Sequence, residues 1–296
     1  MGPVWFALAF AAVSAVAISR ARAWPFELFA HFRPHLIVAG AVLSAVMLAW
    51  DMAAAALAVA ATIANLATFP KLKYRVAEPQ SDAGLCVLWA NLWKSDAALR
   101  RTLIYARQKN ADVLLFAEFP DADAAWVSVN AADYPHVLIS EVSQARFTSR
   151  VAVLSRHAFE HSETMTSPPL QQRAFQTVSI RCGGKALQIS AAHPAAPGTP
   201  QMLRDRDAAM AMIFERLVDP ALVGGDFNAA PWCPSLYSAP PRIGNPFAES
   251  TWLTRWPLIG LPIDHLFVTA SVRVSAYEVG PFLGSDHRAL LARVHI

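Results

Sequence analysis

Charged residues are scarce in this sequence of 296 amino acids. Asp, Glu, Lys and Arg make up 16% of the residues, against about 25% in an average soluble domain. The shortage is local, because residues 1–70 contain five of the 47 charged residues and the rest of the chain contains the other 42. The first 70 residues are too apolar for an ordinary soluble domain, whereas the remainder has the composition and length of one globular domain.

Cysteine is also scarce, with only Cys86, Cys182 and Cys233 in the chain. An odd number of widely separated cysteines excludes a disulfide framework and a cysteine-based zinc site, and it fits a reducing compartment. His157 and His161 are four residues apart, but no further ligand accompanies them, so we interpret them as surface residues.

A surplus of basic residues is missing from the globular part. The net charge of the chain is +3, of which residues 1–70 contribute +1 and Lys71, Lys73 and Arg75 contribute +3, so residues 76–296 carry about −1. Proteins that grip duplex nucleic acid spread basic side chains over the docking face. The basic residues beside the apolar segment instead suit anionic lipid headgroups.

Residues 1–70 contain long apolar runs. The runs are Met1–Ser19, Leu36–Trp50 and Met52–Phe69. We expect a membrane anchor of about three short transmembrane helices, with a hairpin turn at Asp51, because one continuous helix would bury that carboxylate within the bilayer. A cleaved secretory signal is disfavoured because Arg20 and Arg22 follow the first run and do not precede it.

Basic residues predict the orientation of this anchor. They are Arg20, Arg22 and Arg33 after the first run, and Lys71, Lys73 and Arg75 after the third. With three spans both groups lie on one side, which the positive-inside rule makes cytoplasmic. If the second and third runs formed one span, the globular domain would face outward. We expect a basic and polar linker over residues 71–84, followed by a catalytic domain over residues 85–296.

From residue 85 on, short apolar runs typical of buried strands alternate with amphipathic segments typical of helices. The expected strands are Leu85–Asn91, Val113–Phe116, Val151–Leu154, Phe175–Ile180, Lys185–Ala192, Ile263–Val268, Val272–Val279 and His287–Val294. The expected helices are Asp96–Gln108 and Met202–Leu217, and the proline-rich segment Trp232–Leu261 is expected to be a long surface excursion.

The stretch Leu-Val-Gly-Gly-Asp-Phe-Asn over residues 222–228 places a carboxylate and an amide at the end of a strand-like run. Asp226 and Asn228 are two residues apart, so in extended backbone they point to the same side. Such a pair suits a site that holds water and a phosphate oxygen. Asp and Asn are also common in turns that follow strands, so other acidic or imidazole groups must be placed nearby to favour a functional site over an ordinary turn.

Partners are present, because most of the other strand-like runs also end or begin at polar residues. In chain order the set is Asn91, Glu118, His193, Asp226 with Asn228, Asp264, and Asp286 with His287. The surrounding motifs LLFAE, SAAHP, GDFN, IDH and GSDHR resemble those of the endonuclease/exonuclease/phosphatase superfamily across residues 85–296. The resemblance implies an α+β fold, a four-layered α/β/β/α sandwich of two mixed sheets. With the apolar lead, the chain looks like a membrane-anchored bacterial branch, a multi-pass protein of the inner membrane.

The resemblance also implies roles for these residues. Asn91, Glu118 and Asp286 would be metal ligands, and their oxygen atoms suit Mg²⁺ or Mn²⁺ better than zinc. Asp226, helped by Asn228, would orient or deprotonate the attacking water. His287 held by Asp264, together with His193, would contact the phosphate, and the sequence does not decide which histidine is the base. Ala117 and Ala192 stand where the family often has Gln and Thr.

These expectations together predict a metal-dependent phosphodiester hydrolase attached to the lipid bilayer through residues 1–70. Its substrate would be a phosphoester such as a lipid headgroup, a nucleotide or a nucleic acid. A membrane-anchored nuclease is the alternative. A non-catalytic scaffold is disfavoured, because none of the expected acidic and imidazole groups is missing.

Overall fold

The computed structural model describes residues 2, 4–19, 24–78, 84–122, 124–141, 149–166, 173–244, 249–256 and 258–296. These fall into two compact units. The helical unit comprises Met1–Leu72, Pro197–Leu203 and Ala230–Tyr237, and the sandwich unit comprises Lys73–Ala196, Arg204–Ala229 and Ser238–Ile296. Arg20, Arg22 and part of the expected linker lie outside the described residues.

The helical unit contains α1 (Val4–Ile18), α2 (Phe26–His31), α3 (Arg33–Leu48) and α4 (Met52–Ala67). Helices α1 and α3 both pack against α4. Gly40 permits this close packing, since a Cβ atom there would lie 2.2 Å from the Oγ1 atom of Thr62 in α4. The chain reverses between α3 and α4, where the Asp51 carboxylate accepts hydrogen bonds from the amides of Ala53 and Ala54 at the start of α4.

One expectation for this segment needs correction. The three long helices have 15, 16 and 16 residues, and in the described part of the chain none has the length and apolar character for a transmembrane span. The expected spans are therefore not supported. Arg33, one of the basic residues used to predict orientation, is buried: its guanidinium donates to the Asn65 carbonyl at 2.7 Å and to Thr68 Oγ1 at 2.9 Å, which caps the end of α4.

The sandwich unit contains two mixed sheets. In spatial order the seven-stranded sheet consists of β1 (Tyr74–Arg75), β10 (Arg242–Ile243), β11 (Asp264–Val268), β9 (Ala221–Asp226), β8 (Lys185–Ala192), β7 (Phe175–Cys182) and β6 (His161–Met165). The six-stranded sheet consists of β12 (Arg273–Phe282), β13 (Arg288–His295), β2 (Leu85–Asn91), β3 (Val113–Ala117), β5 (Val151–Ser155) and β4 (His136–Ile139). The strands that sequence patterning missed, β1, β4, β6 and β10, are short. Strands β1 and β10 place parts of the expected linker and surface excursion in a sheet, and β6 begins at His161.

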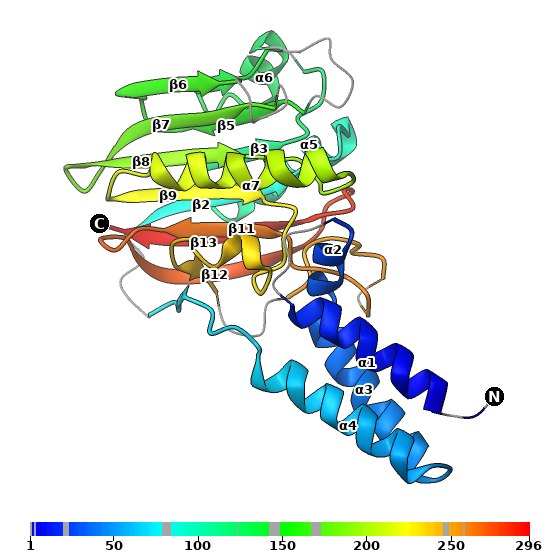
Figure 1. Ribbon diagram of the computed structural model, residues 1–296. Coiled ribbons are helices and arrows are strands. Elements are labelled where there is room, and N and C mark those ends of the chain that lie inside the picture. Colours follow the sequence, from blue (N-terminus) through cyan, green and yellow to red (C-terminus); the bar gives the residue numbers. More distant parts are fainter. Residues whose placement is uncertain are drawn as a thin grey trace. The chain divides into compact units, whose positions relative to one another are not determined.

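Helices cover the outer faces of both sheets (Figure 1). Between the sheets, Val87, Trp89 and Leu115 pack with apolar residues of β8, β9 and β11. The alternate residues Leu88 and Leu114 face α5 (Asp96–Gln108) and α6 (Ala124–Asn130). On the opposite side Phe214 of α7 (Pro200–Glu215) packs against rings of the seven-stranded sheet. The expected α/β/β/α sandwich is confirmed for this unit.

Strand pairing explains why the polar strand ends meet. Strands β2 and β3 are parallel, as are β8 and β9, so the carboxyl ends of each pair share an edge. Strand β11 runs antiparallel to β9 and pairs Asp264 directly with Asp226. Gly225 is required beside them, because a Cβ atom there would lie 2.6 Å from the Phe227 ring and 2.8 Å from the Ala192 carbonyl oxygen.

Candidate active site

Asp226, the last residue of β9, lies at the centre of the polar cluster. Its Oδ2 atom accepts a hydrogen bond from Asn91 Nδ2 at 3.1 Å and lies 3.5 Å from His193 Nε2 and 3.8 Å from His287 Nε2. Its Oδ1 atom accepts from the Asn228 amide at 3.0 Å. Four other residues predicted from the sequence are thus brought together around one buried carboxylate.

His287 is held by a second carboxylate. Its Nδ1 atom lies 2.8 Å from Asp264 Oδ2, and both side chains are buried. The other oxygen of Asp264 accepts a hydrogen bond at 2.9 Å from the indole of Trp89, which lies in the core between the sheets. The core therefore fixes Asp264, and Asp264 fixes the imidazole of His287. The sequence predicted the contact between Asp264 and His287 but not the contact between Trp89 and Asp264.

His193 follows β8 and is held by two residues that sequence reasoning missed. Ser149 Oγ lies 2.7 Å from its Nδ1 atom, and Arg173 Nη1 lies 3.0 Å from its Nε2 atom and donates to the Pro194 carbonyl. Arg173 is buried beside the acids, so a cation faces the cluster. Neither residue belongs to a recognisable motif. The only sequence signal was their place just before strand-like runs.

The electrostatics of the two histidines differ. Burial lowers the pKa of His287, but the charges of Asp264 and Asp226 outweigh burial and raise it to about 10. Burial and the Arg173 cation hold the pKa of His193 well below its usual value. At neutral pH His287 is therefore an imidazolium and His193 is neutral. Burial and the neighbouring Asp264 charge raise the pKa of Asp226 to about 7, so this carboxyl exchanges a proton near neutral pH.

Two site residues adopt left-handed backbone conformations, Glu118 with φ 47° and Asn228 with φ 49°. Such strain in residues other than glycine is concentrated at functional sites. It corrects the expectation that Asn228 continues an extended strand alongside Asp226. Strand β9 ends at Asp226, and the Asn228 side chain donates instead to the Pro194 carbonyl at 3.1 Å.

Carboxylates that could hold a metal lie at the accessible side of the cluster. The side chains of Glu118 and Asp286 are 24% and 33% exposed, whereas that of Asp264 is fully buried. Asp226, Asp264 and His287 also offer atoms within 4.8 Å of one another, but both Asp264 oxygens are already hydrogen-bonded to Trp89 and His287.

The side-chain nitrogen of Asn91 donates to Asp226 Oδ2 at 3.1 Å and to Glu118 Oε1 at 3.4 Å. The side-chain oxygen of Asn91 accepts a hydrogen bond from the Trp93 amide. In this arrangement Asn91 is a donor, and its role as a metal ligand stays a prediction. The partly exposed carboxylates of Glu118 and Asp286 fit a hard divalent cation that needs oxygen ligands and access to substrate.

His265, next to Asp264, points away from the cluster, as strand alternation predicts. Its Nδ1 atom accepts from Arg242 Nε at 3.1 Å, and its Nε2 atom lies 2.8 Å from the Ala229 carbonyl oxygen. Burial and the Arg242 cation lower the pKa of His265 to about 3. It is a neutral core residue that stabilises the turn after β9.

Comparisons with known proteins agree with this geometry. Residues 88–287 match the sequence model of the Endonuclease/Exonuclease/phosphatase family. A search of curated protein sequences gave no significant match. Among solved structures, the chain is similar to an endonuclease/exonuclease/phosphatase from Beutenbergia cavernae DSM 12333, with 19% identity, a TM-score of 0.59 and 72% of each chain covered.

Two other similar structures bear names that state an activity or a ligand. D. rerio TDP2 complexed with single strand DNA product shares 16% identity with a TM-score of 0.57, over 73% of this chain and 100% of that one. Sphingomyelinase C from Streptomyces griseocarneus shares 19% identity with a TM-score of 0.50, over 71% of this chain and 99% of that one. At these identities the likeness establishes the fold.

Proposed function

Because the chain belongs to the endonuclease/exonuclease/phosphatase family, we propose that it is a metal-dependent phosphodiester hydrolase with its catalytic centre at Asp226. The observation that carries this proposal is the convergence on that carboxylate of Asn91, Asn228, His193 and His287. The set combines a proton acceptor, an imidazolium and hydrogen-bond donors. Such a combination is what attack of water on a phosphodiester requires.

In the proposed reaction, Asp226 accepts a proton from water as the water oxygen forms a bond to phosphorus and the bond to the leaving oxygen breaks. The leaving oxygen takes a proton from solvent. The His287 imidazolium and the Arg173 guanidinium place positive charge beside the phosphate oxygens, where negative charge increases in the transition state. Asp264 keeps His287 charged and correctly oriented.

Glu118 and Asp286 would hold the divalent cation, Mg²⁺ or Mn²⁺, with Asn91 beside them. When bound, such an ion neutralises charge on the phosphate oxygens. Carboxylate oxygens favour these hard ions over zinc, which usually takes nitrogen and sulfur ligands.

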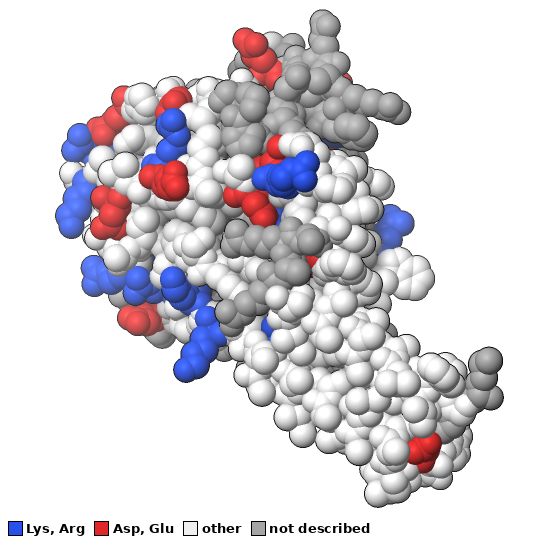
Figure 2. Space-filling view, in the orientation of Figure 1, with Lys and Arg blue, Asp and Glu red and all other residues white. Residues whose placement is uncertain are grey.

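The helical unit would attach the enzyme to a lipid bilayer. Of the 26 large hydrophobic side chains exposed in the described residues, 17 lie within residues 4–66, and Trp5, Phe6, Trp50 and Met52 are each more than 60% exposed. Figure 2 shows few charged side chains over α1, α3 and α4 on its visible face. Exposed apolar area of this extent is stabilised by contact with lipid. The basic residues Lys71, Lys73 and Arg75 would add attraction to anionic headgroups at the cytoplasmic face of a bacterial inner membrane.

A nuclease is the second candidate, favoured by the similarity to D. rerio TDP2 complexed with single strand DNA product. Against a duplex substrate, residues 76–296 have no basic surplus. A non-catalytic scaffold is the third and is disfavoured by the complete site.

The test measures hydrolysis by the purified full chain of bis(p-nitrophenyl) phosphate, phospholipid, single-stranded DNA and duplex DNA. We expect activity that depends on Mg²⁺ or Mn²⁺, disappears with chelator, and falls by about a thousandfold or more in Asp226→Asn. Asp121→Asn is the matched control, because the Asp121 side chain is 96% exposed. Activity that persists in Asp226→Asn, or that needs no metal, would contradict the proposal.

A further inference from the structure

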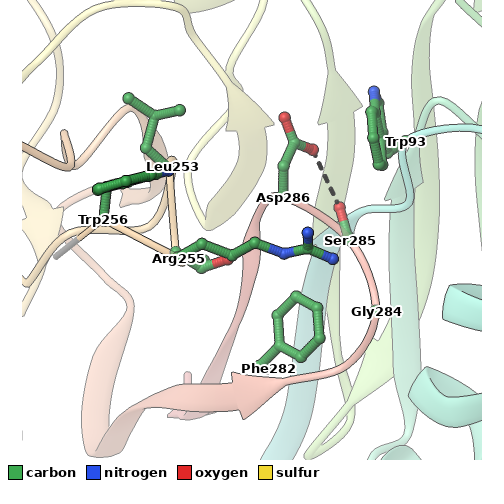
Figure 3. Close-up of a pocket in the computed structure, with 9 residues that line it drawn as sticks. Trp93, Leu253, Arg255, Trp256, Phe282, Gly284, Ser285 and Asp286 are labelled. Atoms are coloured by element: carbon green, nitrogen blue, oxygen red, sulfur yellow. Dashed lines mark hydrogen bonds between the residues drawn. The ribbon is translucent and has the colours of Figure 1, made fainter.

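A pocket of about 160 Å³ opens beside Asp286 (Figure 3). Its walls include Trp93, Leu253, Arg255, Trp256 and Phe282. Pockets that enclose a whole small-molecule ligand usually measure about 300–1,000 Å³. This one therefore suits a single part of a larger substrate whose phosphate lies next to Asp286.

The segment that forms the pocket is fastened to the catalytic edge. The Trp252 indole donates to Asp286 Oδ2 at 3.2 Å, and the backbone of Trp252 bridges to both Leu261 and His287. The Ile259 amide donates to the Trp256 carbonyl, which closes a turn. The pocket thus has a fixed position relative to the proposed metal ligand.

Arg255 supplies a cation to this pocket. Its guanidinium lies 5.8 Å from the centroid of the Phe282 ring, and its side chain makes no hydrogen bond or ion pair with any residue that the structure describes. Figure 3 shows the side chain extending into the pocket, with Phe282 on one side and Asp286 on the other. A planar guanidinium without a carboxylate partner is well suited to bind phosphate oxygens.

Three exposed apolar side chains line the pocket and two more lie in the segment that follows Trp256, and we call these five the apolar rim. They are Trp93, Trp256, Leu258, Ile259 and Phe282, with exposed fractions of 59%, 65%, 88%, 51% and 49%. Tryptophan is common where proteins meet the surface of a bilayer. The aliphatic Leu258 and Ile259 provide no ring on which a nucleobase could stack, so the rim as a whole suits acyl chains and the interfacial region of lipid.

We propose that the apolar rim docks on a phospholipid surface and that Arg255 holds the phosphate of the lipid whose phosphodiester is hydrolysed. This assignment of substrate class rests on the proposed hydrolase function. A nucleic acid strand is less compatible, because it presents a row of phosphates that calls for several cations, and among the described residues that line the pocket Arg255 is the one basic residue.

The experiment compares full-length wild type, Leu258→Ser, Trp256→Ala and Arg255→Gln on phosphatidylglycerol vesicles, on single-stranded DNA and on water-soluble bis(p-nitrophenyl) phosphate, with Mg²⁺ or Mn²⁺. Val129→Ser is the matched control, since Val129 is 78% exposed on α6, outside the rim. Leu258 and Trp256 would become buried in lipid when the rim docks, so removal of either side chain should lower kcat/KM on vesicles by about tenfold to a hundredfold. For Leu258→Ser, at a position outside the pocket lining, kcat/KM on the soluble diester should change less than about twofold, and Val129→Ser should resemble wild type on every substrate.

Other results overturn the assignment. If Leu258→Ser and Trp256→Ala each lost as much kcat/KM on the soluble diester as on vesicles, the loop would only support the site. A loss confined to single-stranded DNA would make the pocket a base-stacking subsite. Wild type that hydrolyses the soluble diester but no vesicle lipid would refute the lipid assignment and leave the proposed function intact. Wild type that hydrolyses neither with Mg²⁺ or Mn²⁺ would refute both.

Discussion

Replacing Trp89 with phenylalanine would remove the indole donor from Asp264 and keep most of the aromatic volume in the core. Trp89 is fully buried, and its Nε1 atom lies 2.9 Å from Asp264 Oδ1. A hydrogen bond to a charged group contributes about 1.5–3 kcal/mol to stability. In a unit of this size each kcal/mol corresponds to about 2–4 °C in Tm, so Trp89→Phe should lower Tm by about 3–12 °C.

Activity should fall more than this loss of stability explains. Without the indole, Asp264 can rotate and the orientation of His287 is no longer fixed. Removal of a group that orients a site residue typically costs about 10–100-fold, and we expect this loss in kcat on bis(p-nitrophenyl) phosphate with little change in KM. The measurement is steady-state kinetics at a temperature where thermal unfolding shows both proteins to be folded.

Val87→Ala provides the matched control for Trp89→Phe. Val87 lies two residues away on the same face of β2 and is fully buried in the same core, and its apolar side chain has no donor for a hydrogen bond to Asp264. It should lower Tm by a comparable amount through the loss of apolar packing, and its kcat should stay within about threefold of wild type. Equal losses of kcat in the two variants, or full activity of Trp89→Phe, would refute the coupling of core and site.

Two further predictions follow from buried groups outside the motifs. Arg173→Gln should raise the pKa of His193, because a neighbouring cation is removed, and should lower kcat by about 10–100-fold. Histidine NMR titration and kinetics would check this, and an unchanged His193 pKa would contradict it. His265, with a pKa of about 3 in the folded protein, should make stability fall as pH decreases from 6.5 toward 3, because only the unfolded state gains the proton. The slope should approach about 1.4 kcal/mol per pH unit. Urea unfolding between pH 4 and 7 would measure it, and His265→Asn should have a weaker dependence.

The meeting of the polar strand ends was predictable because strand order and strand direction leave few arrangements. Asn91 and Glu118 lie at the ends of neighbouring parallel strands, and His193 and Asp226 lie at the ends of another such pair. Apolar runs that each end in a polar residue therefore indicate a shared edge of a sheet even when the chain between them is long. Sequence pattern was also sufficient for His265, since alternation along β11 separates it from Asp264.

Residues that hold the catalytic groups in place were not predictable by the same reasoning. Trp89 has the sequence appearance of an ordinary core aromatic residue, and its bond to Asp264 depends on how the two sheets face each other. Arg173 and Ser149 converge on His193 from positions 20 and 44 residues away along the chain. Arg33 was counted among the basic residues between apolar runs, and its partners Asn65 and Thr68, more than 30 residues away along the chain, were not predictable from the sequence.

The direction of the side chains at the site could be predicted from sequence periodicity only within the strands. Alternation predicts direction only inside a strand, yet Glu118 and Asn228 lie just beyond strands β3 and β9, where the backbone becomes left-handed. Tertiary hydrogen bonds support both conformations, since the Glu118 amide donates to Ser149 Oγ and the Asn228 carbonyl accepts from Arg206. Ser149 also contacts His193, so one hydroxyl links the backbone of the candidate metal ligand to the imidazole. Catalytic geometry at this edge is therefore a property of contacts between distant segments.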